Sequence, residues 1–432
     1  MGKFANASSV LISFAVVLSV LSALAIQSAG VGAVPGATSV GVSPSTQTVL
    51  VGENFTVGIA VNPAEPVYGI ALELRFDPAL VSATEVLAGD LGAVNETDFY
   101  LVVKNIFNQE GIVELAGLTV GKVNTISSPG TLATIKFISK SAGTSGLAIE
   151  DLGVRKFENE VPVLAPSEAS SGGVLVVAPP EVLSVVPSEA AWDPGNEYTI
   201  TATVGDNNGL SDLDNIIVKA YSGDMAPDAS DSERDHYTFW FDPSDNSWHS
   251  SLGPEFIDAA NCFAPEDLSE NEGEYVFAVN LAKIAEPTKW NVCAQAVDSY
   301  EIQGSLENAE AVTVMVYTEF SLDRYALNFS GMPGETVNPE LGPSIVTVTT
   351  NKDFDFRVRL PGDWTTDGLT MPMETTTATG DTTVALTDSY QTVWTGVGYG
   401  EDVARQIAWG LNIPDDQGPG TYRTSFYVNV AH

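Results

Sequence analysis

Short runs in which apolar and polar side chains alternate recur along the chain from residue 38 onward. In the run 69–77, Gly-Ile-Ala-Leu-Glu-Leu-Arg-Phe-Asp, every second side chain is large and apolar. A period of two predicts a β-strand with one buried and one wet face. Asp77-Pro78 ends this strand, because proline lacks an N–H and restricts the residue before it. The runs 345–350 and 354–360 alternate in the same way, and long runs with a helical period are absent after residue 30, which predicts an all-β protein.

The length of the chain and its breakers divide this pattern into three β-sandwich domains in tandem. At ~150 residues per domain, 432 residues predict about three domains. Ala178-Pro179-Pro180 is typical of an extended linker. We therefore expect domains over 34–178, 179–317 and 318–432, each a β-sandwich and none a close repeat of another.

The N-terminal residues 1–33 are typical of a secretory signal peptide. Lys3 supplies the basic start, Val10 to Ile26 the apolar stretch, and small residues at 28–33 a cleavage site. The protein is therefore expected to be secreted and to act at the cell surface. The alternative is an uncleaved membrane anchor, because ~17 apolar residues reach the short limit for a membrane span.

The two cysteines, Cys262 and Cys293, fit an exported protein and predict one disulfide within the middle domain. Triplets that begin at Asn54, Asn95 and Asn328 match the N-glycosylation sequon.

The strong negative charge of the chain limits the kinds of molecule that it can bind. A net charge of −38 excludes a nucleic acid, because phosphates would be repelled. The segment 179–317 is the most acidic third, since 26 acidic against four basic residues give it −22. Hydration of the surface in high salt and binding of divalent cations both account for such an excess.

One acidic loop is a candidate metal site. Asp206, Asn208, Asp212 and Asp214 place four oxygen-bearing side chains around Gly209. Calcium takes 6–8 oxygen ligands, but the spacing differs from that of an EF-hand loop. Asp and Asn are also common in ordinary turns, so a calcium site and a plain strand turn stay open.

Catalysis finds little support in the sequence. The three histidines, His236, His249 and His432, have no metal-ligand spacing, and neither a Gly-x-Ser-x-Gly elbow nor a His-Glu-x-x-His motif occurs. We predict that the protein is not an enzyme and needs no cofactor beyond the calcium considered above. Five tryptophans could stack on sugar rings if they were exposed in a row, but burial in the core is the favoured interpretation. They are Trp240, Trp248, Trp364, Trp394 and Trp409.

The N-terminal third resembles the cohesin family. The motifs are Val-Gly-Glu-Asn-Phe-Thr-Val at 51–57, Gly-Ile-Ala-Leu-Glu-Leu-Arg-Phe-Asp-Pro at 69–78 and Ala-Gly-Asp-Leu at 88–91. Further glycine-led runs at 111–117, 130–137 and 172–177 follow in the family's order. The resemblance spans about 38–177 and implies a nine-stranded jelly roll that docks a dockerin, a calcium-loaded helical module. The two later segments resemble immunoglobulin-like or fibronectin-like modules of archaeal and bacterial surface proteins.

The resemblance also implies a binding face, made of the outward residues of two neighbouring strands. These residues are Gly69, Ala71, Glu73 and Arg75 on one strand and Glu114 and Ala116 on the next. Gly69 and Ala71 stand where cellulosomal cohesins carry an Asn-x-Asp pair, which argues against a cellulosome-type dockerin but not against docking through this face. The alternative is that Glu73 and Arg75 only solvate an exposed sheet.

Together these observations predict a secreted, non-catalytic surface protein that docks a partner protein or takes part in adhesion or extracellular assembly. Polysaccharide binding is the first alternative, and self-assembly as a structural subunit of a surface layer or filament is the second.

Overall fold

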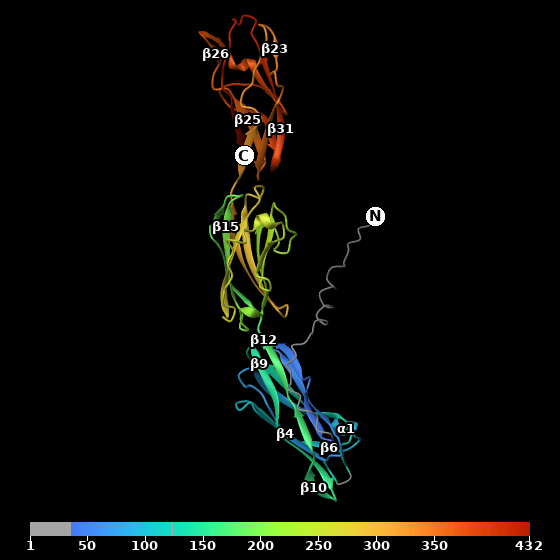
Figure 1. Ribbon diagram of the computed structural model, residues 1–432. Coiled ribbons are helices and arrows are strands. Elements are labelled where there is room, and N and C mark those ends of the chain that lie inside the picture. Colours follow the sequence, from blue (N-terminus) through green and yellow to red (C-terminus); the bar gives the residue numbers. More distant parts are fainter. Residues whose placement is uncertain (1–35, 122–123) are drawn as a thin grey trace, which may run out of the picture. The chain divides into compact units, whose positions relative to one another are not determined.

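The computed structural model describes residues 36–121 and 124–432, so the predicted signal peptide lies outside the described residues. The chain divides into two compact units, with the boundary in the sequence between Val176 and Val177, and nearly all of the described regular elements are strands (Figure 1). The described helices are the four-residue α1 (Leu91–Val94) and short 3-10 turns. None of them is long and apolar enough to cross a membrane.

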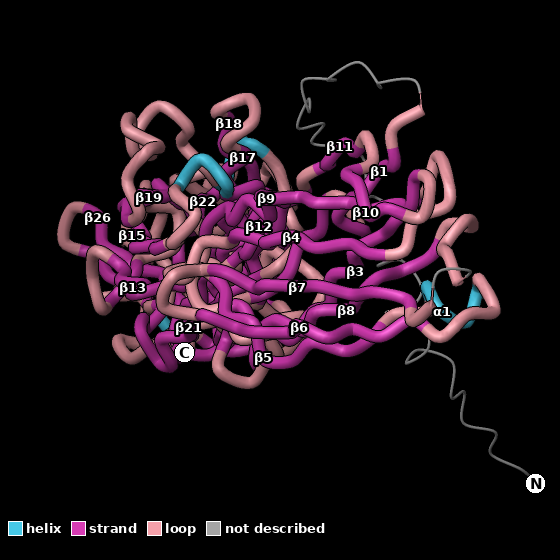
Figure 2. The backbone as a smooth tube through the Cα atoms, turned by 90° about the horizontal axis from the view of Figure 1, so that it is seen from below, coloured by secondary structure: helices cyan, strands magenta, loops and turns pink. Residues whose placement is uncertain are grey.

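The first unit is a sandwich of two sheets. One sheet has the order β11-β1-β3-β8-β5, and the other has the order β2-β12-β9-β4-β7-β6 with β10 paired to β9 (Figure 2). The described part of this unit has twelve strands rather than the nine that the resemblance implies, because the short β2 and β11 pair at sheet edges and the short β10 pairs with the end of β9. The bounds are β1 (Thr38–Ser43), β2 (Thr46–Leu50), β3 (Asn54–Asn62), β4 (Gly69–Arg75), β5 (Val81–Ala88), β6 (Phe99–Phe107), β7 (Ile112–Thr119), β8 (Gly130–Ser139), β9 (Gly143–Glu158), β10 (Val161–Leu164), β11 (Ser167–Ser170) and β12 (Gly172–Val177).

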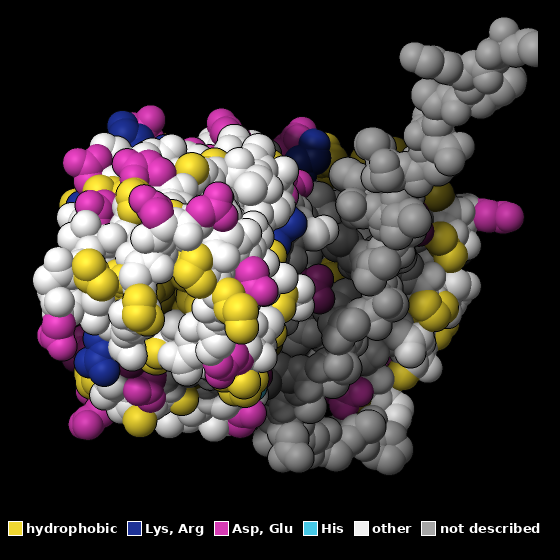
Figure 3. Space-filling view, turned by 90° about the horizontal axis from the view of Figure 1, so that it is seen from above, with side chains coloured by type: hydrophobic (Ala, Val, Ile, Leu, Met, Phe, Trp, Pro, Cys, Tyr) yellow, Lys and Arg dark blue, Asp and Glu magenta, His cyan; other side chains and the backbone are white. Residues whose placement is uncertain are grey.

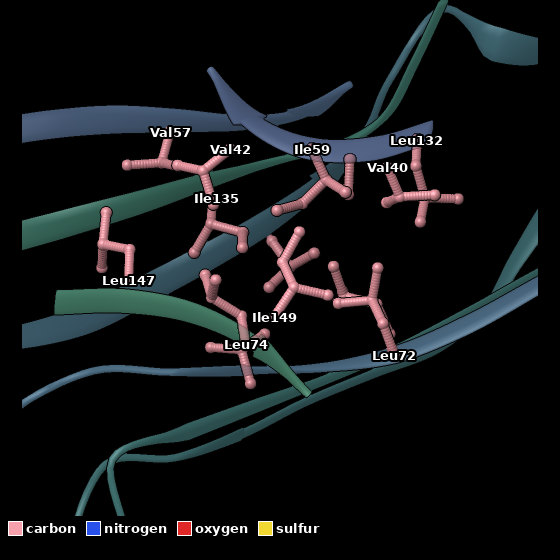
Figure 4. Packing of buried hydrophobic residues seen from close by; sticks show 14 of the residues in the cluster. Val40, Val42, Val57, Ile59, Leu72, Leu74, Leu132, Ile135, Leu147 and Ile149 are labelled. Atoms are coloured by element: carbon pink, nitrogen blue, oxygen red, sulfur yellow. The ribbon is translucent and has the colours of Figure 1, made fainter. Parts of the chain in front are cut away.

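The core of the first unit is aliphatic and comes from both sheets. Figure 4 shows the side chains of the two sheets pointing toward one another. The labelled residues are Val40, Val42, Val57, Ile59, Leu132 and Ile135 from one sheet and Leu72, Leu74, Leu147 and Ile149 from the other. At one end Phe137 is fully buried, stacked on Phe55 at 5.2 Å and edge-on to Phe76 at 5.3 Å between ring centroids. The alternation in the sequence therefore fixes which face of each strand turns inward.

The second unit begins with a sandwich that has a strongly aromatic core. Its sheets have the orders β13-β15-β19 and β14-β21-β20-β16-β17-β18. Trp192, Trp290, Tyr237 and Phe277 are among its fully buried side chains. The strands are β13 (Glu181–Pro187), β14 (Ala191–Trp192), β15 (Glu197–Gly205), β16 (Leu213–Ser222), β17 (His236–Asp242), β18 (Ser247–Ser250), β19 (Glu272–Asn280), β20 (Lys289–Asp298) and β21 (Gln303–Val314).

A second sandwich with its own core completes this unit. One sheet has the order β22-β24-β31-β28-β29 with β23 paired to β31, the other has the order β30-β25-β32, and β26 and β27 form a hairpin. The strands are β22 (Thr318–Leu322), β23 (Thr336–Val337), β24 (Ser344–Thr350), β25 (Phe354–Arg359), β26 (Trp364–Thr366), β27 (Leu369–Met371), β28 (Thr376–Thr379), β29 (Thr383–Ala385), β30 (Gln391–Val397), β31 (Gly400–Asn412) and β32 (Tyr427–Ala431).

Within the second unit, hydrogen bonds join its two sandwiches. Arg234 Nη1 donates to the carbonyl oxygens of Ile284 at 2.8 Å and Asn351 at 2.7 Å. The guanidinium carbon of Arg234 lies 3.8 Å from the ring centroid of Tyr399. Asn351 is fully buried, and its Nδ2 donates to the carbonyl oxygen of Ala285 at 2.9 Å. The loop between β16 and β17 thus supplies the arginine that connects the two sandwiches.

The predicted disulfide is wrong, because both cysteines are free thiols. Cys262 packs beside β19, where its Sγ accepts the N–H of Ala278 at 3.3 Å. Cys293 lies on β20 in the other sheet, between the buried Val292 and Ala294, so it points away from the core. Burial raises the pKa of Cys262 to about 11 and also raises the pKa of Cys293, which keeps both thiols protonated at neutral pH.

Candidate functional site

The candidate site is the outer face of the sheet in which β9, β4, β7 and β6 run side by side (Figure 2). On β4, Ile70, Leu72 and Leu74 are buried, whereas Ala71 and Arg75 between and after them are exposed.

The turn between β6 and β7 leaves no space for a side chain at Gly111. Gly111 there has φ +69°, and a Cβ on it would lie 2.2 Å from the carbonyl oxygen of Phe76.

The centre of this face is flat because its side chains are small. Ala71 lies opposite Ala116 on β7 and Gly153 on β9. Gly69 lies on the same face of β4 as Ala71, but it is buried. A Cβ added to Gly69 would lie 4.0 Å from the Cβ atoms of Leu118 and Arg155. The prediction that Gly69 is part of the exposed face is therefore wrong, because these neighbouring residues cover it.

A row of acidic side chains crosses the face beside this flat centre. Glu73 on β4 is directly opposite Glu114 on β7 and Glu150 on β9. Like charges in directly opposed positions repel. Arg75 offsets the repulsion by pairing with Glu73 at 3.2 Å and with Glu150, and Asn105 donates to Glu114 at 3.1 Å. The structure thus places Glu73, Arg75 and Glu114 side by side on one sheet face.

On the other side of the flat centre, large apolar side chains are exposed on β6 and β7. Tyr100 on β6 is directly opposite Leu118 on β7, and the two are 51% and 37% exposed. Val102 and Val120 are 56% and 58% exposed. This apolar group was not predicted from the sequence. The alternation of Phe99 and Leu101 with Tyr100 and Val102 was the available signal, but it did not show which of the two sets lies inside.

The face therefore combines an apolar area, a flat centre and a row of three carboxylates with one cation. Such a surface fits a partner with an apolar ridge flanked by basic side chains. Because salt screens charges at exposed positions, the acidic row contributes more to orientation than to affinity.

A second cluster lies in the second unit and corresponds in part to the predicted metal loop. Asp206 and Asp212 come together with Asp298, a residue that was not among the predicted ligands. Asn208 instead binds the backbone, because its Oδ1 accepts the N–H of Ala178 at 2.9 Å. Asp214 is exposed and accepts a hydrogen bond from Asn215 at 3.0 Å. Asp298 could not be found from spacing, since packing of the two sheets brings it to the loop.

The sequons differ in accessibility. Asn54 and Asn328 are exposed. The Asn95 side chain is occupied: its Nδ2 donates to the carbonyl oxygens of Leu91 and Ser128, and its Oδ1 accepts the N–H groups of Ser127 and Ser128. Glycosylation of Asn95 would replace one of the two Nδ2 hydrogens that make these bonds and would place a sugar where the backbone now packs, so the fold disfavours it.

The tryptophans do not form an exposed platform. Trp394 and Trp409 are buried, at 2% and 4% exposure, and Trp240, Trp248 and Trp364 are partly buried. His236 is also fully buried on β17, where its Nδ1 lies 2.8 Å from Asp231 Oδ1. The structure therefore places these aromatic side chains mainly in packing roles.

Residues 40–176 match the family model of the cohesin domain, which confirms the resemblance of the N-terminal third. Similar solved structures include a type I cohesin from Pseudobacteroides cellulosolvens, with 18% identity, 33% of this chain and 93% of that chain covered, and a TM-score of 0.27. A non-cellulosomal cohesin from the archaeon Archaeoglobus fulgidus has 18% identity, coverage of 33% and 91%, and a TM-score of 0.26. A type I cohesin–dockerin complex from Clostridium thermocellum has 16% identity, coverage of 33% and 99%, and a TM-score of 0.28. Among curated proteins, none matches this chain.

Proposed function

We propose that this protein is a secreted, non-catalytic docking protein whose first domain binds a dockerin-like partner through the β9-β4-β7-β6 face. The match of residues 40–176 to the cohesin domain supports a protein partner. The observation that carries the proposal is the combination of an exposed apolar pair, Tyr100 and Leu118, with the row Glu114, Glu73 and Glu150 on one sheet face.

The chemistry of the face specifies the partner further. Ala71 and the buried Gly69 offer no side-chain hydrogen bonds, so polar recognition falls to Glu73, Glu114 and the exposed Arg75. A helical module with an apolar ridge against Leu118 and basic side chains against the carboxylates would satisfy both parts. Apolar contact would supply most of the affinity, and the charges would set the orientation.

The test is calorimetric titration of the purified protein with a dockerin-like module encoded in the same genome. Leu118→Asp and Glu73→Lys should each weaken binding at least about tenfold, because the first buries a charge in the apolar contact and the second sets a like charge against the basic partner. Glu85→Lys is the matched control, because Glu85 is an exposed carboxylate paired with Lys136 on the opposite sheet. Equal binding by Leu118→Asp, Glu73→Lys and the wild type would exclude this face.

Self-assembly is a second candidate, supported by the C-terminal strand. β32 hydrogen-bonds only to β25 in its sheet, so its other edge is open among the described strands. An open edge can accept a strand from another chain. Negative-stain microscopy distinguishes the candidates: filaments or lattices of the purified protein favour assembly, and single particles favour docking.

Polysaccharide binding, the remaining alternative, lacks a row of exposed tryptophans among the described residues. Retention on insoluble polysaccharide would be the result that restores it.

A further inference from the structure

Three aspartates meet at one end of the first sandwich of the second unit. Asp206 follows β15, Asp212 closes the 3-10 turn Leu210–Asp212, and Asp298 ends β20. One carboxylate oxygen from each lies within 4.8 Å of the others. Since β15 and β20 belong to different sheets, the cluster spans both layers of the sandwich.

Each carboxylate is held in place through its Oδ1 atom. Asp206 Oδ1 accepts the N–H of Asn208 at 2.7 Å, and Asp212 Oδ1 accepts the hydroxyl of Ser299 at 2.5 Å. Asp298 Oδ1 accepts two backbone N–H groups, from Tyr300 at 2.9 Å and Ile302 at 2.8 Å. These bonds orient the groups before any ligand arrives.

The second oxygen of each carboxylate has no partner. Oδ2 of Asp206, Asp212 and Asp298 is buried without a hydrogen bond among the described residues. None of the described ion pairs involves these three side chains. Burying an anionic oxygen without a hydrogen bond or a cation is unfavourable, so three such oxygens at one point indicate a missing positive ligand.

The burial is specific to this cluster. All 56 acidic residues lie in the described part of the chain, and only Asp206 and Asp298 are buried, at 2% and 1% exposure. Burial, together with the carboxylates of Asp212 and Asp298, raises the pKa of Asp206 to about 6. A surface evolved only for hydration would not place its two buried acids side by side.

We propose that Asp206, Asp212 and Asp298 bind one calcium ion through their three Oδ2 atoms. Carboxylate oxygens that all lie within 4.8 Å of one another are close enough to ligate one ion, because two ligands on opposite sides of calcium are about 4.6–5.2 Å apart. Calcium accepts an irregular set of protein oxygens, whereas magnesium requires near-ideal octahedral geometry and keeps several of its waters, so a site of three protein carboxylates favours calcium. Water and backbone carbonyl oxygens complete the 6–8 ligands, and the partly exposed Asp212 leaves an approach from solvent.

Bound calcium would connect the two sheets. It would join the end of β15 to the end of β20 through Asp206 and Asp298, at the place where carboxylate repulsion otherwise separates them. The ion is therefore structural, and its binding energy adds to the stability of the fold.

The test is calorimetry of the purified protein, first in chelator and then with calcium. At about 100 times the dissociation constant, calcium should raise the melting temperature of the second unit by roughly 5–10 °C. Titration should show one site per chain above the weak binding of surface acids. No rise at about 10 mM calcium, above the 10⁻⁴–10⁻³ M range of extracellular modules, would overturn the proposal. An equal rise with magnesium would overturn the choice of calcium.

Asp298→Asn separates a metal ligand from a purely structural carboxylate. The amide keeps an acceptor for Tyr300 and Ile302, and its Nδ2 can donate to the unpaired oxygens of Asp206 and Asp212. This variant should lose the calcium response yet melt in chelator at or above the wild-type temperature. Asp267→Asn, at an exposed aspartate in the same sandwich, should respond like the wild type.

A full calcium response in Asp298→Asn would refute the site. If Asp298→Asn does not fold, Asp206→Asn provides an independent test. This variant should also lose the rise in melting temperature with calcium, and a retained rise would refute the site.

Discussion

Replacement of Arg234 by alanine should uncouple the two sandwiches of the second unit. The side chain is 19% exposed, and its Nη1 donates to the carbonyl oxygens of Ile284 and Asn351. A hydrogen bond from a charged donor contributes about 1.5–3 kcal/mol, and a cation–π contact such as that with Tyr399 about 0.5–1 kcal/mol. Because water can replace part of this, we expect Arg234→Ala to cost about 2–4 kcal/mol.

The assay is urea unfolding of the purified protein, followed by tryptophan fluorescence. With an m-value of about 2 kcal/mol/M, the expected loss lowers the midpoint of the second unit by about 1–2 M. Tyr399→Leu removes only the ring and should cost about 0.5–1 kcal/mol. If Arg234→Ala shows an additional unfolding transition at lower urea concentration, one of the two sandwiches unfolds independently of the other.

The matched control is Lys283→Ala. Lys283 pairs with Glu319 between the same two sandwiches, but the two side chains are 42% and 49% exposed. Exposed ion pairs contribute little because solvent screens them, so this variant should unfold with the wild type. If Lys283→Ala shifted the midpoint as far as Arg234→Ala, or if neither shifted it, burial of the Arg234 hydrogen bonds would not be what couples the sandwiches.

Two further predictions concern stability. Phe137→Ala removes a fully buried ring stacked on Phe55 and should cost about 3–5 kcal/mol in urea unfolding of the first unit; a loss below about 1 kcal/mol would show that the core collapses into the space. The pKa of Asp355 is lowered by the N–H of Gly396 and by Arg357, so its stabilising contribution is present above the ordinary carboxyl pKa of 3.8 and is lost as pH falls below it. Asp355→Asn should therefore flatten the acid limb of the melting-temperature profile, and an unchanged limb would contradict this.

The sequence was sufficient to predict a strand and its buried face, because both depend only on the order of side chains within that strand. The alternation over 69–77 predicted β4 and its outward residues, because a strand of period two needs only its own side chains to define a buried face. The same reasoning did not foresee that Gly69 is covered, since Leu118 and Arg155 come from the neighbouring strands. The face of a single strand can be predicted locally, but the cover over it depends on pairing register.

Features that depend on how sheets pack could not be predicted. The disulfide rested on there being two cysteines, yet Cys262 and Cys293 belong to different layers of the sandwich. Asp298 reaches the metal cluster for the converse reason, because packing brings the end of β20 to the loop after β15. Arg234 lies in the loop between β16 and β17, and its role depends on Asn351, which is distant in the sequence and belongs to the next sandwich. The neighbours of these four residues are set by tertiary packing, which a local sequence pattern does not contain.

The acidity of the chain therefore has two physical meanings, which act over different distances. Exposed carboxylates, seen at many points on the face in Figure 3 where Lys and Arg are few, create a diffuse negative potential that attracts any cation. Salt removes this potential, because the Debye length falls to about 3 Å at 1 M. Asp206 and Asp298 are buried, so salt screens their contact with an ion much less. A calcium response that survives at about 1 M salt therefore belongs to the cluster, and one that disappears belongs to the surface.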